Sequence, residues 1–467
     1  MFAIFAGVII VSAIFFRFFD YFERILIHSD HSLFAQAAIF SAKTFSIPQI
    51  GPFAQSSFFT GPWWLWILGI FYLFPFGVLG PWYFMSIFSL VFIFLIYIVG
   101  REIGGRWLGA LAALLAGISR AQIDNSLSLW NAAADPLFAA GGIYFLIKFY
   151  QSKKAIYVLF LSFTVGLATT IHFQAGLLLP LVLVALVTSR PKARYFISAF
   201  LGLLIPFVPF LIFDLRFSWF WAKSVLIYIT VDQYRFWVPN RWLTYAFDYW
   251  PTTWGYILGV GKWLGFLIIG LLSILTILRL REAPKFKIFF LLALSFFLEV
   301  VMYRYWGGQR FVYFSNFAQP AVFIFTAWVI VELSKIARPL SAVLAIVIFS
   351  LAFKTSIINL KPPDITVSKI SHVKSELFNN FDGENFDIYG CSFGGALISH
   401  PLALFIWADG RNRQDGEKIG VCYLADKTIS WHVLTEEEIA DRETWLNHST
   451  ENTYRTMTEW WKTNPPK

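Results

Sequence analysis

Charged residues and cysteines are scarce in this sequence. Only 14% of its 467 residues are Asp, Glu, Lys or Arg, whereas 58% are hydrophobic and 20% are aromatic. An ordinary soluble domain has about 25% charged residues, so that class of protein is excluded. Apolar runs of about 20 residues recur along the chain, each long enough to cross a hydrocarbon core of roughly 30 Å. The composition therefore predicts an all-α polytopic membrane protein.

Sequence patterns for nucleotides and metals are also missing. There is neither a G-x-x-x-x-G-K-[ST] loop nor a G-x-G-x-x-G turn that follows a strand. No group of His and Cys has the spacing of a zinc site. We therefore predict no cofactor and name no metal ligand, and a metal requirement stays open. The two cysteines, Cys391 and Cys422, lie in the polar tail. They could form a disulfide if the tail is extracytoplasmic, and a free pair is equally compatible with the sequence.

The net charge of +9 hides a split between two parts of the chain. From Lys361 onward there are 11 basic and 16 acidic residues, so the preceding part holds 26 basic and 12 acidic residues. The positive-inside bias of membrane proteins explains this excess without a nucleic-acid partner. Half of these 26 basic residues lie in five short connectors, which we predict to be cytoplasmic. The connectors are 101–106, 151–154, 189–194, 279–287 and 334–338.

The connectors alternate with pairs of apolar runs, which predicts about eleven transmembrane helices. The expected spans are 1–19, 81–100, 106–119, 132–150, 155–171, 175–188, 195–213, 258–279, 286–303, 315–334 and 339–358. Met1–Phe19 has no basic n-region, so it is expected to be a permanent span. Trp63–Gly77 is short and lies between Pro62 and Pro75, which favours an interfacial or re-entrant helix. This topology places the amino terminus in the cytoplasm and the tail outside.

The chain thus divides into a transmembrane domain, 1–360, and a small extracytoplasmic α/β domain, 361–467. In the tail, Asn385–Tyr389 and Lys418–Leu424 are predicted strands. Ser368–Phe378 and Glu436–Trp445 are predicted helices, the second capped by Thr435. The tail has no recognisable catalytic signature. We expect it to be a lid or an acceptor-contacting accessory domain.

A single acidic residue stands out in the external loop 20–80. Asp30 lies between His28 and His31, and Leu33–Lys43 can form an amphipathic helix on the membrane surface. A carboxylate at such a boundary is partly desolvated, and its basicity can rise toward that of a general base. Asp30 is therefore the main candidate for catalysis.

Several segments of the transmembrane part resemble the GT-C glycosyltransferases. The first span is followed by a long external loop with an early acidic residue and by the segment GPWWLWILG. The resemblance continues in YIVGREIGGRWLGALAALLAGIS, GLATTIHFQAGLLLP and GGQRFVYFSNFAQP, and it covers about residues 1–335. The branch that it resembles most is that of the protein O-mannosyltransferases and the lipid A aminoarabinose transferase. The external loops have no D-x-D pair, which argues against the metal-dependent oligosaccharyltransferase branch.

The resemblance implies roles for individual residues. Asp30 matches the acidic residue that is thought to deprotonate the acceptor, which then displaces a polyprenyl phosphate with inversion. Many members have Asp-Glu at this site, whereas this chain has Asp30-His31. The second acidic position falls within SLWNAAADPLF, where Asn131 and Asp135 are both candidates and Asp124 lies nearby. Asp135 is the preferred catalytic partner, although a carboxylate that favours a helix dipole is an equal alternative.

The implied leaving group is a phosphate anion, which needs cations or hydrogen-bond donors on the external side. Arg304 and Arg310 lie in one external loop, and His172 and Gln174 lie in another. These four residues are the candidates for binding the donor phosphate. His31, Asn131 and Arg216 are the remaining candidates for the substrate-binding loops.

The sequence therefore predicts an inverting, integral-membrane glycosyltransferase. Its partners would be the bilayer, a polyprenyl-phosphate sugar donor, and an extracytoplasmic acceptor that is a protein, a lipid or a glycan. One alternative is an O-antigen ligase or polymerase, which would use the late external loop with Arg216, Arg235 and Arg241. Another is a secondary transporter, but neither an internal repeat nor ionisable residues at mid-membrane support it.

Overall fold

The computed structural model describes residues 2–54, 58–188, 192–231, 242–282, 286–305, 310–381, 384–391, 396–412, 414–441 and 443–463. Each predicted span coincides with a helix or with two consecutive helices. They are α1 (Phe2–Phe18), α5 (Gly80–Gly104), α6 (Arg106–Gly117), α8 (Asp135–Ser152), α9 (Ala155–Ile171), α10 (Leu179–Val187), α11 (Ala193–Leu204) with α12 (Val208–Arg216), α16 (Lys262–Arg279), α17 (Lys287–Arg304), α18 (Gln319–Ile336) and α19 (Arg338–Ile358). Within the described ranges, six helical segments are long and apolar enough to cross a membrane by themselves.

Glycines allow the helices α5 and α6 to pack closely. A Cβ atom on Gly109 would lie 2.4 Å from the carbonyl oxygen of Tyr97, and one on Gly100 would lie 2.7 Å from the Cα of Gly109. Between the helices, Gly105 has φ 87°, a conformation that other residues adopt only with strain. Small residues at such contacts let two membrane helices approach each other and gain packing energy. The GREIGGRWLG segment therefore folds into a tight helical hairpin.

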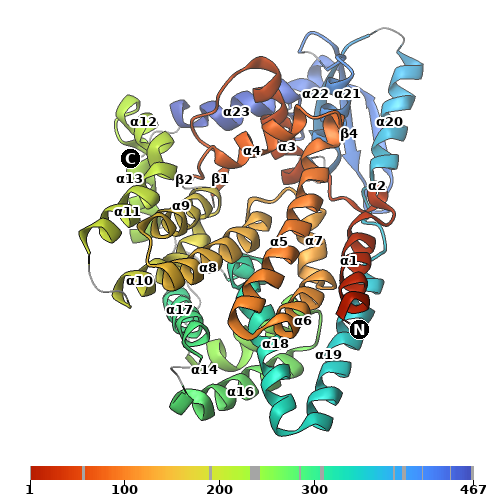
Figure 1. Cartoon of the computed structure of the whole chain (residues 1–467). Coiled ribbons are helices and arrows are strands. Elements are labelled where there is room, and N and C mark those ends of the chain that lie inside the picture. The colour runs from red at the N-terminus through yellow and green to blue at the C-terminus, as the bar shows by residue number, and fades with distance from the viewer. Residues whose placement is uncertain are drawn as a thin grey trace.

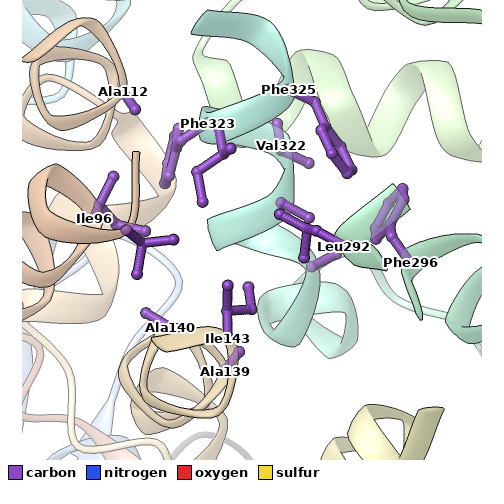
Figure 2. Close-up of a cluster of buried hydrophobic side chains, with 14 of the residues drawn as sticks. Ile96, Ala112, Ala139, Ala140, Ile143, Leu292, Phe296, Val322, Phe323 and Phe325 are labelled. Carbon is purple, nitrogen blue, oxygen red and sulfur yellow. The ribbon is translucent and has the colours of Figure 1, made fainter. Parts of the chain in front are cut away.

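Helix α18 lies at the centre of the transmembrane core. Almost all of its side chains from Gln319 to Ile330 are buried. Figure 2 shows its residues Val322, Phe323 and Phe325 between side chains of α5, α6, α8 and α17. Lipid tails are as apolar as these side chains, so dense packing, rather than exclusion from water, stabilises the arrangement.

The first helix carries a buried arginine. Arg17 is fully buried, and its Nε donates a hydrogen bond to Ser89 Oγ of α5 at 2.9 Å. Its Nη1 donates to the carbonyl oxygen of Gly117 at the end of α6, also at 2.9 Å. A charged group at membrane depth is costly unless its donors are satisfied. These bonds therefore tie α1 to the α5–α6 hairpin.

Shorter elements occupy the connections between these helices. They are α2 (Tyr21–Arg24), α3 (Ser29–Thr44), β1 (Phe53–Ala54), β2 (Phe58–Phe59), α4 (Trp63–Tyr72), η1 (Gly77–Leu79), α7 (Arg120–Ser126), η2 (Asn131–Ala134), η3 (Phe173–Leu178), η4 (Ile205–Phe207), α13 (Phe220–Thr230), α14 (Trp242–Thr244), η6 (Tyr245–Tyr249), α15 (Trp250–Leu258), η7 (Leu280–Glu282) and η8 (Val312–Ala318). Helix α4 has ten residues and is thus about 15 Å long, half of a membrane crossing. This length agrees with the interfacial interpretation of Trp63–Gly77.

The predicted amphipathic helix forms as α3, but its environment differs from the prediction. Instead of lying on the membrane surface, α3 packs against α4 and against α21 and α23 of the tail. Ala35, Ala37 and Ala38 are completely buried in these contacts. The small side chains explain the difference, because they let helices approach α3 from more than one side.

The tail folds as an α/β unit around a four-stranded sheet in the order β5-β4-β3-β6. Its elements are α20 (Val367–Asn380), β3 (Phe386–Cys391), α21 (Ala396–Ala408), β4 (Glu417–Tyr423), β5 (Ile429–Val433), α22 (Glu436–Ala440), β6 (Trp445–Asn447) and α23 (Thr450–Thr463). Strands β3 and β4 are parallel, with Phe386 opposite Glu417, and β5 and β6 pair antiparallel at the two edges. Cys391 and Cys422 form a disulfide between β3 and β4.

One predicted element of the tail is wrong. The helix expected over Glu436–Trp445 begins as predicted with a capping box at Thr435 and Glu438, but it ends at Ala440. Trp445 instead belongs to strand β6, where it pairs with Cys391. The sheet offers this aromatic residue a buried position, and that tertiary contact overrides the local helical pattern.

The tail sits at one end of the helical bundle (Figure 1). Helices α21 and α23 lie beside α3 there, and α19 leads directly into α20. The turn between α18 and α19, which contains one of the basic connectors, lies at the opposite end. The fold thus gathers the loop 20–80 and the tail at one end of the bundle.

Candidate active site

Asp30 lies in the first turn of α3 and its side chain is exposed. It lines a cavity of about 710 Å³. Leu33 and Phe34 of the same helix and Phe53 of β1 form one wall, and residues of the tail form the other. The cavity has the size of a small-ligand pocket, for which volumes of roughly 300–1,000 Å³ are usual. The predicted base is therefore accessible to a ligand.

Of the two histidines beside Asp30, His31 lies in the protein interior and His28 is partly exposed. His31 is completely buried, and its ring stacks on Trp130 with a centroid distance of 5.3 Å. Burial, assisted by the neighbouring His28, lowers the pKa of His31 to about 3. Burial also lowers the pKa of His28, against the attraction of the Asp30 carboxylate. His31 is thus a neutral group that packs behind Asp30 rather than a residue exposed on a substrate loop.

An aromatic series connects this loop with a second polar site. The ring of Trp130 contacts Tyr313 of η8 at 5.1 Å, and Tyr313 contacts Phe314 at 4.7 Å. Phe314 lies 5.9 Å from the ring of His172. Segment η8 therefore runs between the loop that carries Asp30 and the carboxyl-terminal end of α9, where His172 lies.

Asp135 and His172 form a buried pair. Nδ1 of His172 lies 2.5 Å from Oδ2 of Asp135, and the carboxylate is completely buried. The side chain of His172 is 8% exposed. Asp135 begins α8 and His172 caps the end of α9, so the antiparallel α8–α9 hairpin brings together two residues that are 37 positions apart. Both were predicted site residues, but their contact was not predicted.

Amide side chains connect the segments that surround this pair. Nδ2 of Asn131 donates to the carbonyl oxygen of Ile171 at 2.8 Å, which joins η2 to the end of α9. Gln174 is buried in η3, next to the same helix end. Asn316 was missed in the sequence analysis, although it lies in the polar segment SNFAQ within an apolar run. Its Nδ2 donates to the carbonyl oxygen of Ala132 at 3.0 Å and thereby attaches η8 to η2.

Arg304 and Arg310 lie together, as predicted. Nη2 of Arg310 donates to the carbonyl oxygen of Arg304 at 2.7 Å. The guanidinium of Arg304 lies 5.0 Å from the ring centre of Trp242, and that of Arg310 lies 5.3 Å from the ring centre of Tyr245. Burial lowers the pKa of Arg310. The two arginines therefore give a concentrated positive charge next to η8.

The remaining candidates lie apart from these groups. Arg216 is exposed at the end of α12, and Asp214 accepts hydrogen bonds from the backbone of Trp221 and Ala222. Arg235 and Arg241 lie outside the described residues. Asp124 faces Arg120, with 3.5 Å between Oδ2 and Nε. Among the residues that the structure describes, no three His, Cys, Asp or Glu side chains form a group that could hold a metal.

Comparison with known proteins supports the fold. Residues 59–213, from β2 to α12, match the family model of dolichyl-phosphate-mannose-protein mannosyltransferase. This segment contains Asn131, Asp135, His172 and Gln174 but not Asp30. No curated protein matches the sequence.

Three solved structures resemble the chain over most of its length. ArnT from Cupriavidus metallidurans in the apo state has a TM-score of 0.60 at 11% identity, covering 90% of this chain and 92% of that one. The same protein bound to undecaprenyl phosphate has a TM-score of 0.58 at 12% identity, with the same coverage. The oligosaccharyltransferase AglB from Archaeoglobus fulgidus, in complex with an inhibitory peptide and a dolichol-phosphate, has a TM-score of 0.53 at 9% identity. That match covers 98% of this chain and 77% of AglB.

Another structure of an oligosaccharyltransferase from Archaeoglobus fulgidus, in the apo form, has a TM-score of 0.52 at 12% identity. The match covers 81% of this chain but only 58% of that protein, so the chain spans little more than half of its length. The similarities agree with the resemblance found in the sequence. The chain has the GT-C fold of ArnT, with a small sheet-containing region at its carboxyl end.

Proposed function

We propose, from this fold, that the protein is an inverting glycosyltransferase that moves a sugar from a polyprenyl-phosphate donor to an extracytoplasmic acceptor. The observation that carries the proposal is the position of Asp30. Its exposed carboxylate lines a ligand-sized cavity between the loop 20–80 and the tail. A general base must reach the proton that it removes, and this position provides that access.

In the proposed reaction, an acceptor hydroxyl or amine loses its proton to Asp30. The acceptor atom then forms a bond with the anomeric carbon while the bond from that carbon to the phosphate oxygen breaks. Polyprenyl phosphate leaves as an anion, and the configuration at the anomeric carbon inverts. Fixed cations and donors at the leaving group lower the barrier because they stabilise the developing charge.

The groups available for the leaving phosphate lie on both sides of η8. Arg304 and Arg310 meet at one end of this segment, and the Asp135–His172 pair lies beside Phe314. The buried carboxyl group of Asp135 orients the imidazole of His172 through the contact between Oδ2 and Nδ1. Asp135 thus acts through His172, while His172, Gln174 and the arginines contact the donor.

The arginine pair gives a prediction about donor binding. Arg310→Ala should weaken the binding of undecaprenyl phosphate at least tenfold, because a charge-assisted hydrogen bond to phosphate contributes about 1.5–3 kcal/mol. Binding can be measured with purified protein in detergent. Arg194→Ala is a matched control, since Arg194 lies at the start of α11 and is the last residue of the basic connector 189–194. Equal donor affinity in Arg310→Ala and the native protein would remove Arg310 from the phosphate site.

The proposed orientation gives a second prediction. An epitope tag fused after Lys467 should be accessible to antibody on intact cells, because the basic connectors are expected on the cytoplasmic side. A tag inserted in the connector 151–154 serves as the control and should be detected only after the membrane is permeabilised. If the carboxyl-terminal tag is protected in intact cells, the tail is cytoplasmic and the proposed site faces the wrong compartment.

A further inference from the structure

The cavity that holds Asp30 is built mainly by the tail. Most of its lining comes from Tyr389 of β3, from strand β6, and from His448, Asn452, Thr453, Arg455, Thr456 and Met457. The tail is therefore part of the site and not only a cover above it. A ligand that fills this cavity would contact both Asp30 and the tail.

Direct contacts hold this wall against α3. Nε2 of Gln36 donates to the carbonyl oxygen of His400 at 2.5 Å. Phe40 packs its ring on Tyr454 of α23 with a centroid distance of 4.6 Å. Further along α23, Trp460 packs on Phe53 of β1, also at 4.6 Å. Both ends of α23 are thus anchored to the loop that carries Asp30, and the cavity has a defined shape.

The polar groups of the wall are pre-oriented and mostly uncharged. Nδ1 of His448 lies 2.5 Å from Ser399 Oγ. The imidazole fits at this position because residue 390 is glycine. A Cβ atom on Gly390 would lie 2.6 Å from Nδ1 of His448. Burial lowers the pKa of His448 to about 4, so its imidazole is neutral at physiological pH. His400 stacks on His448 at 4.3 Å and is also buried.

Two observations indicate that this wall of the cavity can bind a ligand. The Nδ1 atom of His400 is buried without a hydrogen-bond partner, although the residue lines the cavity. Such an atom is costly unless a ligand or water satisfies it. On α23, Nη2 of Arg455 donates to Oδ1 of Asn452 at 3.0 Å, which holds a guanidinium group with five N–H donors in the cavity lining.

The wall does not suit an extended peptide. A peptide that added to the sheet would have to pair with the edge strand β6. There, the N–H of Trp445 already donates to Asp441, and the carbonyl oxygen of Asn447 already accepts from Nδ2 of Asn452. Recognition must therefore use side chains. Neutral imidazoles, an amide, hydroxyls and aromatic edges suit a ligand with many hydroxyl groups and no charge.

We infer that this cavity binds the acceptor and that the acceptor is a neutral glycan, held by His400, His448, Asn452 and Arg455 with one hydroxyl directed at Asp30. The inference rests on the proposed function for the identity of the ligand as an acceptor. The binding of a glycan at this place can be tested without any transfer reaction.

The test uses the full-length protein in detergent without donor. The probes are the neutral trisaccharides mannotriose, maltotriose and triacetylchitotriose, together with a hydroxylated peptide, Ala-Thr-Ser-Thr-Ala. We expect at least one trisaccharide to bind with a dissociation constant of roughly 1 mM or better, about −4 kcal/mol. The double variant Asn452→Ala with Arg455→Ala should weaken that binding at least tenfold. Glu459→Ala on the same helix, where Glu459 pairs with Lys462 at the surface, should leave it unchanged.

Undecaprenyl phosphate binding is measured on the same samples. If the trisaccharides bind and the double variant does not, the glycan site is supported even when no transfer is ever detected. If donor binding is intact but only the peptide binds, or if the double variant binds trisaccharide as well as the native protein, the inference is overturned and the proposed transferase is not. Gly390→Ala, which displaces His448, should also weaken trisaccharide binding, although it changes no residue of α23.

Discussion

The substitution Asp30→Asn is expected to reduce sugar transfer by about 10²- to 10⁴-fold, the usual contribution of a general base. Asparagine keeps the shape of the side chain but has no basic oxygen. Because Asp30 is exposed in the first turn of α3 and asparagine has nearly the same size, the protein should remain folded. Transfer is measured as release of polyprenyl phosphate with purified protein, and folding by thermal denaturation.

Asp20→Asn is the matched control for this experiment. Asp20 is an exposed carboxylate in the same loop, and its left-handed backbone, with φ 46°, accepts asparagine readily. It should retain full transfer. If Asp30→Asn turns over at the native rate, the base is another group, and the O-antigen ligase reading of the late external loop gains support. A loss of turnover in both variants would indicate a general effect on the loop instead.

The largest effect on stability is expected for His172→Leu. This change leaves the completely buried carboxylate of Asp135 without its partner at Oδ2, and its Oδ1 already has none. Leaving a buried polar group without its hydrogen-bond partner costs about 1–3 kcal/mol. The free energy of unfolding, measured by denaturant titration in detergent, should fall by that amount.

The double variant Asp135→Leu with His172→Leu separates stability from function. Replacing both partners by apolar residues is often nearly neutral, so we expect most of the lost free energy to be recovered. Transfer should nevertheless stay low, because the imidazole that we propose to contact the donor is gone. A single variant as stable as the native protein would contradict the buried pair, and full activity of the double variant would exclude His172 from the phosphate site.

The sequence predicts the transmembrane helices well because their signal is local. A run such as 339–358 is long and apolar, and α19 covers Arg338–Ile358. The position of Asp135 and His172 at the same end of the α8–α9 hairpin also follows from the connector 151–154 between their helices. Their 2.5 Å contact does not follow, because it depends on how α8 and α9 are rotated against each other. Hydrophobic pattern gives the face of a helix but not its register against a neighbour.

The structure of the tail and its contacts with the loop 20–80 were the least predictable features of the protein. Its parallel strands β3 and β4 were found from their β-branched and aromatic residues, but α21, α23, β5 and β6 were not. Helix α23 is polar in sequence and reads as a solvated segment. Only in the folded chain do Tyr454, Met457 and Trp460 meet Phe40, α3 and Phe53. The cavity wall therefore depends on contacts between residues some 400 positions apart, which no local pattern encodes.

The buried Arg17 has a consequence for biogenesis. Its hydrogen-bond acceptors on Ser89 and Gly117 are synthesised 72 and 100 residues after Arg17 itself. During translation, Arg17 therefore lacks these acceptors until the α5–α6 hairpin has been synthesised. Until then, α1 must stay in the insertion machinery or at the membrane surface, where water can solvate the guanidinium. Shortening the chain before Gly117 would leave this first helix unable to settle in the bilayer, whereas removing the tail would not.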